Sequence, residues 1–203
     1  GECLQTLHGH SGFVNSVSYS PDGKKILSGS DDRMVKEWSV SNGECLQTLQ
    51  GHGNQVMSVI YSPNGKKILS GSVDRTLKEW LVSSGKCLQT FRGHDSWVMS
   101  VCYSPDGKKI LSGSRDKTVK EWLVDSGECL RTLQGHDNWV MSVSYSHDGK
   151  KILSGSRDKT IKEWSVVPST ECLKTFKGHS EVMSVSYSPN GKKILSGLAD
   201  FTI

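Results

Sequence analysis

Residues 93–133 read GHDSWVMSVCYSPDGKKILSGSRDKTVKEWLVDSGECLRTL, and this stretch decides the fold. Side chains over 98–103 alternate between two faces, which is the period of a β-strand. Pro105-Asp106-Gly107 predicts a tight turn, because proline fixes φ, aspartate caps the turn and glycine accepts a positive φ. Three further strands are expected, over 108–114, 118–124 and 129–133. The stretch therefore predicts a four-stranded antiparallel meander, and no segment carries a helical period.

The same pattern recurs along the whole chain. Gly-His pairs end at His10, His52, His94, His136 and His179, at steps of 42, 42, 42 and 43 residues. One meander cannot bury both of its faces, whereas copies stacked radially around an axis can, and a ring leaves only short edges. A period of about 42 residues with four strands is typical of a propeller blade. The sequence predicts an all-β protein, a β-propeller of four-stranded antiparallel blades.

We expect a single domain over residues 1–203, because no linker or low-complexity segment interrupts the repeats. It comprises a strand over 1–8, repeats at approximately 9–50, 51–92, 93–134 and 135–177, and an incomplete repeat over 178–203. Two arrangements remain open. The strand over 1–8 completes the last blade of a closed five-bladed ring, or the repeats are part of a larger ring of seven or a similar number of blades. The sequence favours the second, a segment of a longer repeat chain. Self-association through open blade edges, which unpaired strands invite, is a further alternative beside the closed ring.

Composition narrows the class of protein. Of 203 residues, 23% are charged and 34% hydrophobic, which fits a soluble globular domain. A net charge of +4 without clustered aromatic residues argues against a nucleic-acid partner. No apolar run reaches the roughly 18 residues that span a bilayer, so no membrane partner is expected.

The six cysteines indicate neither a metal site nor a disulfide framework. Five share one repeat position and Cys102 stands alone; the five are Cys3, Cys45, Cys87, Cys129 and Cys172. Spacings of 42 or 43 residues lack the close pairs of a zinc site. We expect reduced thiols that behave as small apolar side chains, no metal and no cofactor. Reduced thiols favour an intracellular, cytoplasmic protein.

Three motifs together resemble the WD-repeat family: the Gly-His pair, Ser-Gly-Ser-x-Asp, and a tryptophan 28 residues after the histidine. The resemblance covers the whole chain, as about five tandem repeats of 42 residues. The family's Trp-Asp pair is absent, because the tryptophans precede Ser39, Leu81, Leu123 and Ser165. A glutamate precedes each tryptophan where the family usually has an apolar residue: Glu37, Glu79, Glu121 and Glu163. These glutamates either pair with strand lysines or mark an exposed face.

Histidine, serine, aspartate and tryptophan recur at fixed offsets. The sets are His10, Ser28, Asp32, Trp38; His52, Ser70, Asp74, Trp80; His94, Ser112, Asp116, Trp122; and His136, Ser154, Asp158, Trp164. Serine, histidine and aspartate suggest a catalytic triad, but a triad also needs an oxyanion hole and a cleft, and a separate active site in every blade is not expected. The family resemblance implies a buried hydrogen-bond network from aspartate through histidine and serine to the indole, with Ser30 and its equivalents as the alternative serines. We therefore expect no catalytic residues.

Functional residues are sought where the near-identical repeats differ. The resemblance implies that the variable positions surround the central channel on the face that binds partners. They are Phe13, Asn15, Gln55, Met57, Trp97, Met99, Arg115, Trp139, Met141, Arg157, Glu181 and Met183. Tryptophan and arginine are frequent interface hot spots. One hypothesis is an aromatic and cationic patch for a peptide with an acidic or phosphorylated group; the other is channel packing with solvated arginines.

The sequence thus favours a non-catalytic protein-interaction scaffold or recognition module that binds a peptide or protein around the channel. Two alternatives remain: a structural or designed repeat array without a dedicated partner, and the sensor domain of a larger regulatory protein. The scaffold interpretation depends on the family resemblance together with the lack of a unique titratable cluster in any one repeat.

Overall fold

The computed structural model describes residues 2–166 and 171–200, which contain eighteen β-strands and no helix. Blade 1 comprises β1 (Val14–Tyr19), β2 (Lys25–Ser30), β3 (Val35–Ser39) and β4 (Cys45–Leu49). Blade 2 comprises β5 (Val56–Tyr61), β6 (Lys67–Ser72), β7 (Thr76–Leu81) and β8 (Cys87–Arg92). Blade 3 comprises β9 (Val98–Tyr103), β10 (Lys109–Ser114), β11 (Val119–Leu123) and β12 (Cys129–Leu133). Blade 4 comprises β13 (Val140–Tyr145), β14 (Lys151–Ser156), β15 (Thr160–Ser165) and β16 (Cys172–Lys177), and blade 5 comprises β17 (Val182–Tyr187) and β18 (Ile194–Leu198).

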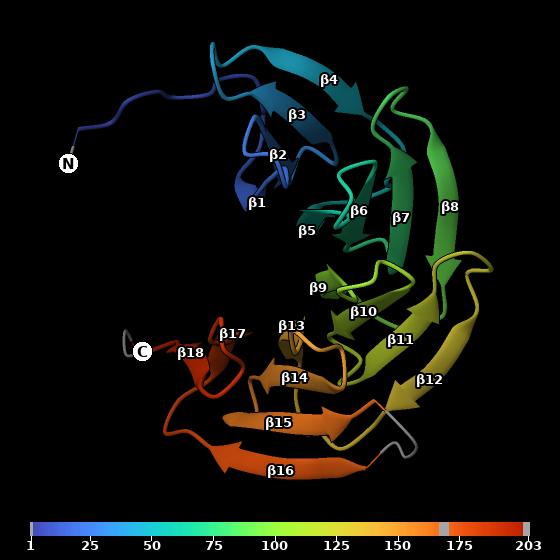
Figure 1. The fold of residues 1–203 in the computed structure, drawn as a ribbon, viewed down its shortest axis with the longest axis vertical. Coiled ribbons are helices and arrows are strands. Elements are labelled where there is room, and N and C mark those ends of the chain that lie inside the picture. Colours follow the sequence, from blue (N-terminus) through green and yellow to red (C-terminus); the bar gives the residue numbers. More distant parts are fainter. Residues whose placement is uncertain (1, 167–170, 201–203) are drawn as a thin grey trace.

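Each blade is an antiparallel meander in chain order, so the predicted all-β fold with four-stranded blades is confirmed. The first strand of each blade lies nearest the centre and the fourth lies outermost (Figure 1). The blades form an open arc, and blade 5 has two described strands. This excludes the closed five-bladed ring among the described residues. No described helix is long and apolar enough to cross a membrane.

The first segment differs from its prediction. A strand was expected over residues 1–8, yet residues 2–10 form no strand. Leu7 still lies near Gly43, as Leu49 of blade 1 lies near Gly85 of blade 2. The segment therefore occupies the position of a fourth strand of a preceding blade. It lacks strand structure because a strand requires a hydrogen-bonding neighbour, and no described strand runs beside it.

Local chemistry fixes the turns of each blade. In the first turn, Asp22 accepts hydrogen bonds from the Ser20 hydroxyl at 2.6 Å and the Lys24 amide at 3.1 Å, and Gly23 adopts a φ of 70°. The second turn has a strained backbone, because Arg33, which is not a glycine, adopts a positive φ of 73°. Such a conformation costs roughly 1–2 kcal/mol. The turn is held by the Asp32 carboxylate, which accepts the amide of Met34 at 3.0 Å.

The hydrophobic core lies between blades rather than within them. Leu27 and Val35 of blade 1 pack with Val56, Val59 and other side chains of blade 2, and equivalent clusters fill the next seams. Glycine is required at position 29, because a Cβ there would lie 2.7 Å from the Val56 side chain. Each blade is therefore stabilised mainly by its neighbours, as in other repeat architectures.

The repeated glutamates join neighbouring blades. Glu37 is 1% exposed, and it accepts hydrogen bonds from Tyr61 of blade 2 at 2.7 Å and from Lys25 of its own blade at 3.2 Å. The same arrangement recurs for Tyr103 with Glu79, Tyr145 with Glu121, and Tyr187 with Glu163. Burial and the adjacent carboxylate raise the pKa of Tyr61, so its hydroxyl stays protonated and donates. The repeated glutamates therefore pair with strand lysines, as one of the two interpretations predicted, and they do not mark an exposed face.

Candidate functional site

The four histidine-centred sets have one common geometry. In blade 3, His94 places Nδ1 2.6 Å from Asp116 and Nε2 2.7 Å from the Ser112 hydroxyl, while the Trp122 indole donates to that hydroxyl at 2.8 Å. The corresponding distances in blades 1, 2 and 4 lie between 2.6 and 2.9 Å. Ser112 and its equivalents thus occupy the centre of the network. The alternative serine in blade 1, Ser30, instead accepts the amide of Asp32 at 3.2 Å.

Electrostatics give this network a direction. Burial raises the pKa of Asp74, but hydrogen bonds from His52 and Thr76 outweigh it and hold that pKa well below its usual range. Burial lowers the pKa of His136 more than Asp158 raises it. In blade 4 the pKa of Asp158 is lowered as well, so a charged aspartate lies beside a neutral imidazole; this assigns the His136 proton to Nδ1, and Nε2 accepts from Ser154. In that network the indole N–H donates to the serine oxygen, the serine O–H donates to histidine Nε2, and the histidine Nδ1–H donates to the aspartate carboxylate.

The serine-to-histidine-to-aspartate direction is that of a catalytic triad, but the surroundings of the serine do not suit nucleophilic attack. Each serine oxygen accepts an indole N–H, and the serine side chains are buried, with Ser70 0% exposed. A satisfied buried network of this kind rigidifies the blade and is costly to break. Among residues 2–166 and 171–200, no cluster of three or more histidine, cysteine, aspartate or glutamate side chains could hold a metal ion.

The cysteines differ from expectation. Cys3, Cys45, Cys129 and Cys172 are exposed rather than buried, and all six thiols are free. Cys45, Cys129 and Cys172 lie on the outermost strands β4, β12 and β16, which explains their exposure, and Cys3 lies in the first segment, which is not a strand. The thiol of Cys45 donates to the Gln47 carbonyl at 3.5 Å. Cys102, on the inner strand β9, is half-buried overall, and burial raises the pKa of its thiol to about 12.

The variable positions lie in pairs on two adjoining loops of each blade. In blade 3 the Arg115 amide donates to the Trp97 carbonyl at 2.9 Å, and in blade 4 the Arg157 amide donates to the Trp139 carbonyl at 3.0 Å. The same backbone bond joins Asp31 to Phe13, Val73 to Gln55, and Ala199 to Glu181. The framework thus presents two side chains per blade at one end of the strands.

Four of these side chains stack into a continuous column. The Arg115 guanidinium carbon lies 3.4 Å from the Trp97 ring centroid and 3.7 Å from that of Trp139. The Arg157 guanidinium carbon lies 4.4 Å from the Trp139 centroid, and its Nε lies 3.3 Å from a Glu181 carboxylate oxygen. The four stacked side chains and the glutamate at the end of the column form a group that we call the Trp–Arg ladder: Trp97, Arg115, Trp139, Arg157 and Glu181. The arginines are stacked on indole rings rather than fully solvated, a cation–π arrangement worth about 0.5–2 kcal/mol each.

The other candidate residues do not join the ladder. Asn15 donates to the Asp31 carboxylate at 2.7 Å and to the Val56 carbonyl at 3.1 Å, so it ties blade 1 to blade 2. Phe13 is 84% exposed, and Gln55 is half-buried. The methionines line the inner strands: Met57, Met99 and Met141 are half-buried and Met183 is exposed. Asp31 lies at the blade 1 position that corresponds to Arg115.

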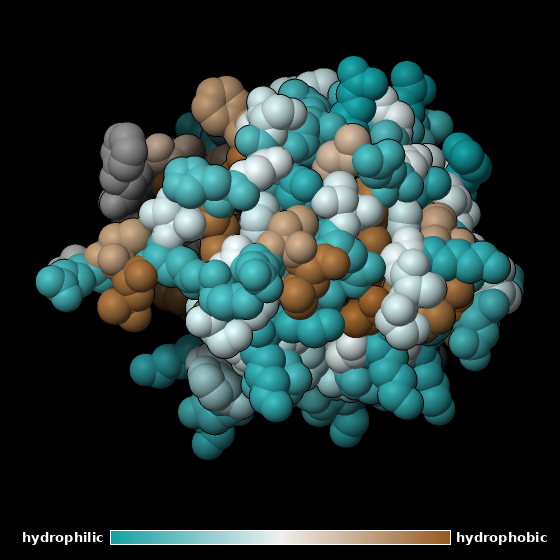
Figure 2. Space-filling view, turned by 90° about the horizontal axis from the view of Figure 1, so that it is seen from above, coloured by the Kyte–Doolittle hydropathy of each residue, from teal (hydrophilic) through white to brown (hydrophobic). Residues whose placement is uncertain are grey.

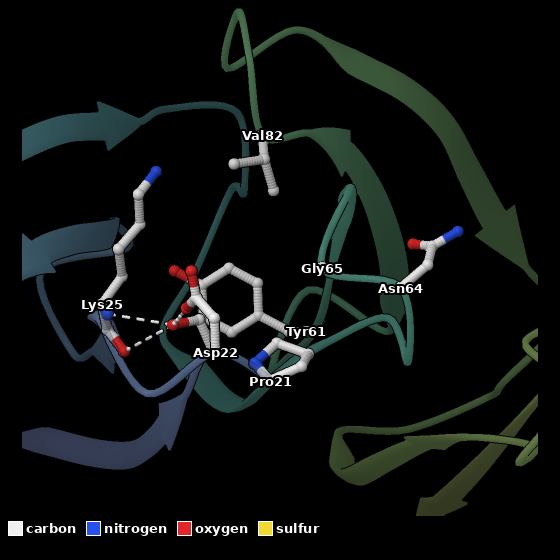
Figure 3. Close-up of a pocket in the computed structure, with 8 residues that line it drawn as sticks. Pro21, Asp22, Lys25, Tyr61, Asn64, Gly65 and Val82 are labelled. Atoms are coloured by element: carbon white, nitrogen blue, oxygen red, sulfur yellow. Dashed lines mark hydrogen bonds between the residues drawn. The ribbon is translucent and has the colours of Figure 1, made fainter.

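The blade seams contain small crevices away from the ladder. One of about 210 Å³ lies between blades 1 and 2, where Figure 3 shows Tyr61 beneath Lys25, Asp22 and Pro21. A crevice of about 190 Å³ repeats this lining between blades 3 and 4. Small-molecule sites usually measure about 300–1,000 Å³. These two crevices fall below that range, whereas hollows of about 550 and 340 Å³ between blades 4 and 5, and one of about 440 Å³ at the ends of β1, β5, β9 and β13, lie within it.

The outer wall is mixed in character. Figure 2, seen from above, shows hydrophobic patches mostly between two hydrophilic rims. Leucines on the outermost strands are partly exposed, among them Leu46, Leu88, Leu130 and Leu173. They recur at one position of the outermost strand in each of blades 1 to 4.

Known proteins match the chain repeat by repeat. The family pattern described as "WD domain, G-beta repeat" matches residues 1–39, 43–80, 85–122, 127–165 and 170–203. The vegetative incompatibility protein HET-E-1 of Podospora anserina is 51% identical over 41 residues, and the transcriptional repressor tup12 of Schizosaccharomyces pombe is 56% identical over 39. The nuclear distribution protein nudF 1 of Talaromyces marneffei is 44% identical over 41 residues.

Each of these matches covers about one repeat. The matches take 20%, 19% and 20% of this chain and 3%, 6% and 9% of those three proteins. The likeness therefore concerns the repeat and not the whole architecture of any relative. The five matched segments together span most of the chain and coincide with the blades of the arc. The chain belongs to the WD-repeat family.

Proposed function

We propose that the chain is a non-catalytic protein-interaction module, and that it binds a peptide or protein segment on the channel face that carries the Trp–Arg ladder. One observation carries the proposal: Trp97 and Trp139, which come from different blades, both lie against the Arg115 guanidinium and remain partly exposed. An ordered aromatic and arginine cluster of this kind is typical of interface hot spots.

Preorganisation supports this function. The loops of the ladder are fixed by backbone hydrogen bonds and by the buried network beneath them, so little conformational entropy remains to be lost on binding. The wall of the disc, by contrast, repeats one exposed leucine in each blade, at Leu46, Leu88, Leu130 and Leu173.

The relatives fit a regulatory function. The three names given above describe a vegetative incompatibility protein, a transcriptional repressor and a nuclear distribution protein, none of them an enzyme name. We place this function inside the cell, a proposal supported by six free cysteines, which suit a reducing compartment.

The test is a selection of displayed random peptides on the immobilised protein, followed by affinity measurements. Trp97→Ala with Trp139→Ala should weaken the selected peptides about 30-fold or more, the effect of losing one hot spot of about 2 kcal/mol. Leu46→Ala with Leu88→Ala removes exposed apolar surface from the wall and serves as the matched control. Equal affinity for both double variants, with melting unchanged, would contradict binding on the channel face.

A further inference from the structure

Arg115 is a cation without a counter-charge among the described residues. Its two faces are covered by the rings of Trp97 and Trp139. Its Nε is enclosed and has no hydrogen-bond partner in the described part of the chain. The terminal nitrogens make no hydrogen bond to described residues either, and they are not enclosed. The free edge of the guanidinium therefore faces outward from between two indole planes.

The surrounding charges do not neutralise it. Glu181 lies against Arg157, one blade further on. Asp31 lies two blades away and accepts the side chain of Asn15. Burial and the positive charge of Arg157 both lower the pKa of Arg115, which shows that the neighbourhood is short of negative charge. The Trp–Arg ladder thus contains two positively charged guanidinium groups and one carboxylate.

We propose that the free edge of Arg115 is the subsite for an aspartate or glutamate side chain of an acidic peptide, an inference that rests on the proposed function. A guanidinium whose faces are stacked can still form two parallel N–H···O bonds along its edge, the geometry that a carboxylate matches. The tryptophans fix the plane of that edge, so the arginine is already oriented before the carboxylate arrives. Trp97 and Trp139 also exclude water from both sides of the ion pair, which strengthens it.

The charge balance favours a carboxylate over a phosphate. One unpaired guanidinium is neutralised by one carboxylate. A phosphoryl group carries about −1.5 to −2 charges at neutral pH and calls for a second free cation. Arg157, the nearest arginine, is already engaged by Glu181. A phosphorylated peptide is therefore an outcome of the test and not the proposed ligand.

Fluorescence polarisation of three labelled hexapeptides tests the proposal: hexaglutamate, hexaglutamine, and a phosphoserine peptide with glutamine at the other positions. Hexaglutamate should bind saturably below about 1 mM, the weak end of specific recognition. Arg115→Gln should weaken it at least tenfold, since it removes the charge and keeps a polar side chain. Lys108→Gln is the matched control, because it removes one exposed positive charge just before β10, whereas Arg115 directly follows the other end of that strand.

Three results would overturn the inference: no saturable binding of hexaglutamate, equal binding by wild type and Arg115→Gln, or tighter binding of the phosphoserine peptide that Arg115→Gln abolishes. A second measurement uses only the unaltered protein: the NMR signal of the Arg115 Nε–H should shift on titration with hexaglutamate and stay in place with hexaglutamine. If selected peptides need Trp97 and Trp139 but not Arg115, the proposed function stands and this inference fails.

Discussion

Blades 1 and 3 have the same framework and differ at the channel face. In both, the amide of the turn residue donates to the loop carbonyl at 2.9 Å, from Asp31 to Phe13 and from Arg115 to Trp97. Phe13 is nevertheless largely exposed, whereas Trp97 lies against a guanidinium. The framework therefore fixes the positions of two side chains in each blade, and the identity of these side chains decides the chemistry of the channel face.

The largest loss of stability is expected when a side chain of the buried hydrogen-bond network is removed. Trp122→Ala removes a ring that is 1% exposed and donates to Ser112, so it should destabilise the fold by about 3–5 kcal/mol. Trp97→Ala, in the same blade, should change stability by less than about 1 kcal/mol, because its ring lies on the face. Urea denaturation of both variants measures the difference. Equal losses would mean that the ladder is part of the core.

The bonds between blades should matter next. Tyr145→Phe removes the donor at 2.6 Å from Glu121 and leaves a buried carboxylate oxygen short of a partner, a cost of about 1–3 kcal/mol. Tyr19→Phe is the control, since Tyr19 holds the equivalent position in blade 1 but is 65% exposed. Its denaturation midpoint should not move. A similar shift in both variants would show that the glutamates do not join the blades.

Acid should weaken the framework through the same groups. The pKa of Asp116 is held below its usual range, against the effect of burial, chiefly by hydrogen bonds from His94 and Thr118. A depressed carboxyl pKa contributes stability that is present above the unfolded pKa of about 3.9 and is lost as the pH falls through the folded value. The free energy of unfolding should therefore fall below about pH 4, and Asp116→Asn should flatten that part of the profile. An unchanged slope would contradict the assigned role of this carboxylate.

The smallest effect tests whether the face is interchangeable. Phe13→Trp with Asp31→Arg copies the side chains of blade 3 onto blade 1. Stability should stay within about 0.5 kcal/mol, because surface changes away from buried features usually do. Asn15 would lose its contact with Asp31, so a larger loss would show that this hydrogen bond, and not the framework alone, holds the loop.

Much of this fold could be predicted from local pattern. The expected strands of the third repeat agree with β9, β10, β11 and β12 to within one residue at each end. Alternation and turn chemistry act within a few residues, so the sequence reveals them directly. The expected strand over 1–8 failed because a strand also depends on a neighbour supplied by another part of the chain.

The site was harder to predict because its contacts cross between blades. Arg115 meets Trp139 from the next repeat, 24 residues further along the chain, and the sequence alone could indicate the patch but not the stacking. The glutamates likewise were ambiguous until the tyrosine of the following blade was located, as for Tyr61 with Glu37. Variation between repeats pointed to the face, while packing decided which of its residues act together.

Hydrogen exchange with and without a selected peptide tests the central claim most directly. Exchange should slow in the loops around residues 95–97, 115–117, 137–139 and 157–159, and the outermost strands β4, β8 and β12 should be unaffected. Slowing confined to those outer strands, or to the turns at the opposite rim, would contradict the claim that function is located where the repeats differ.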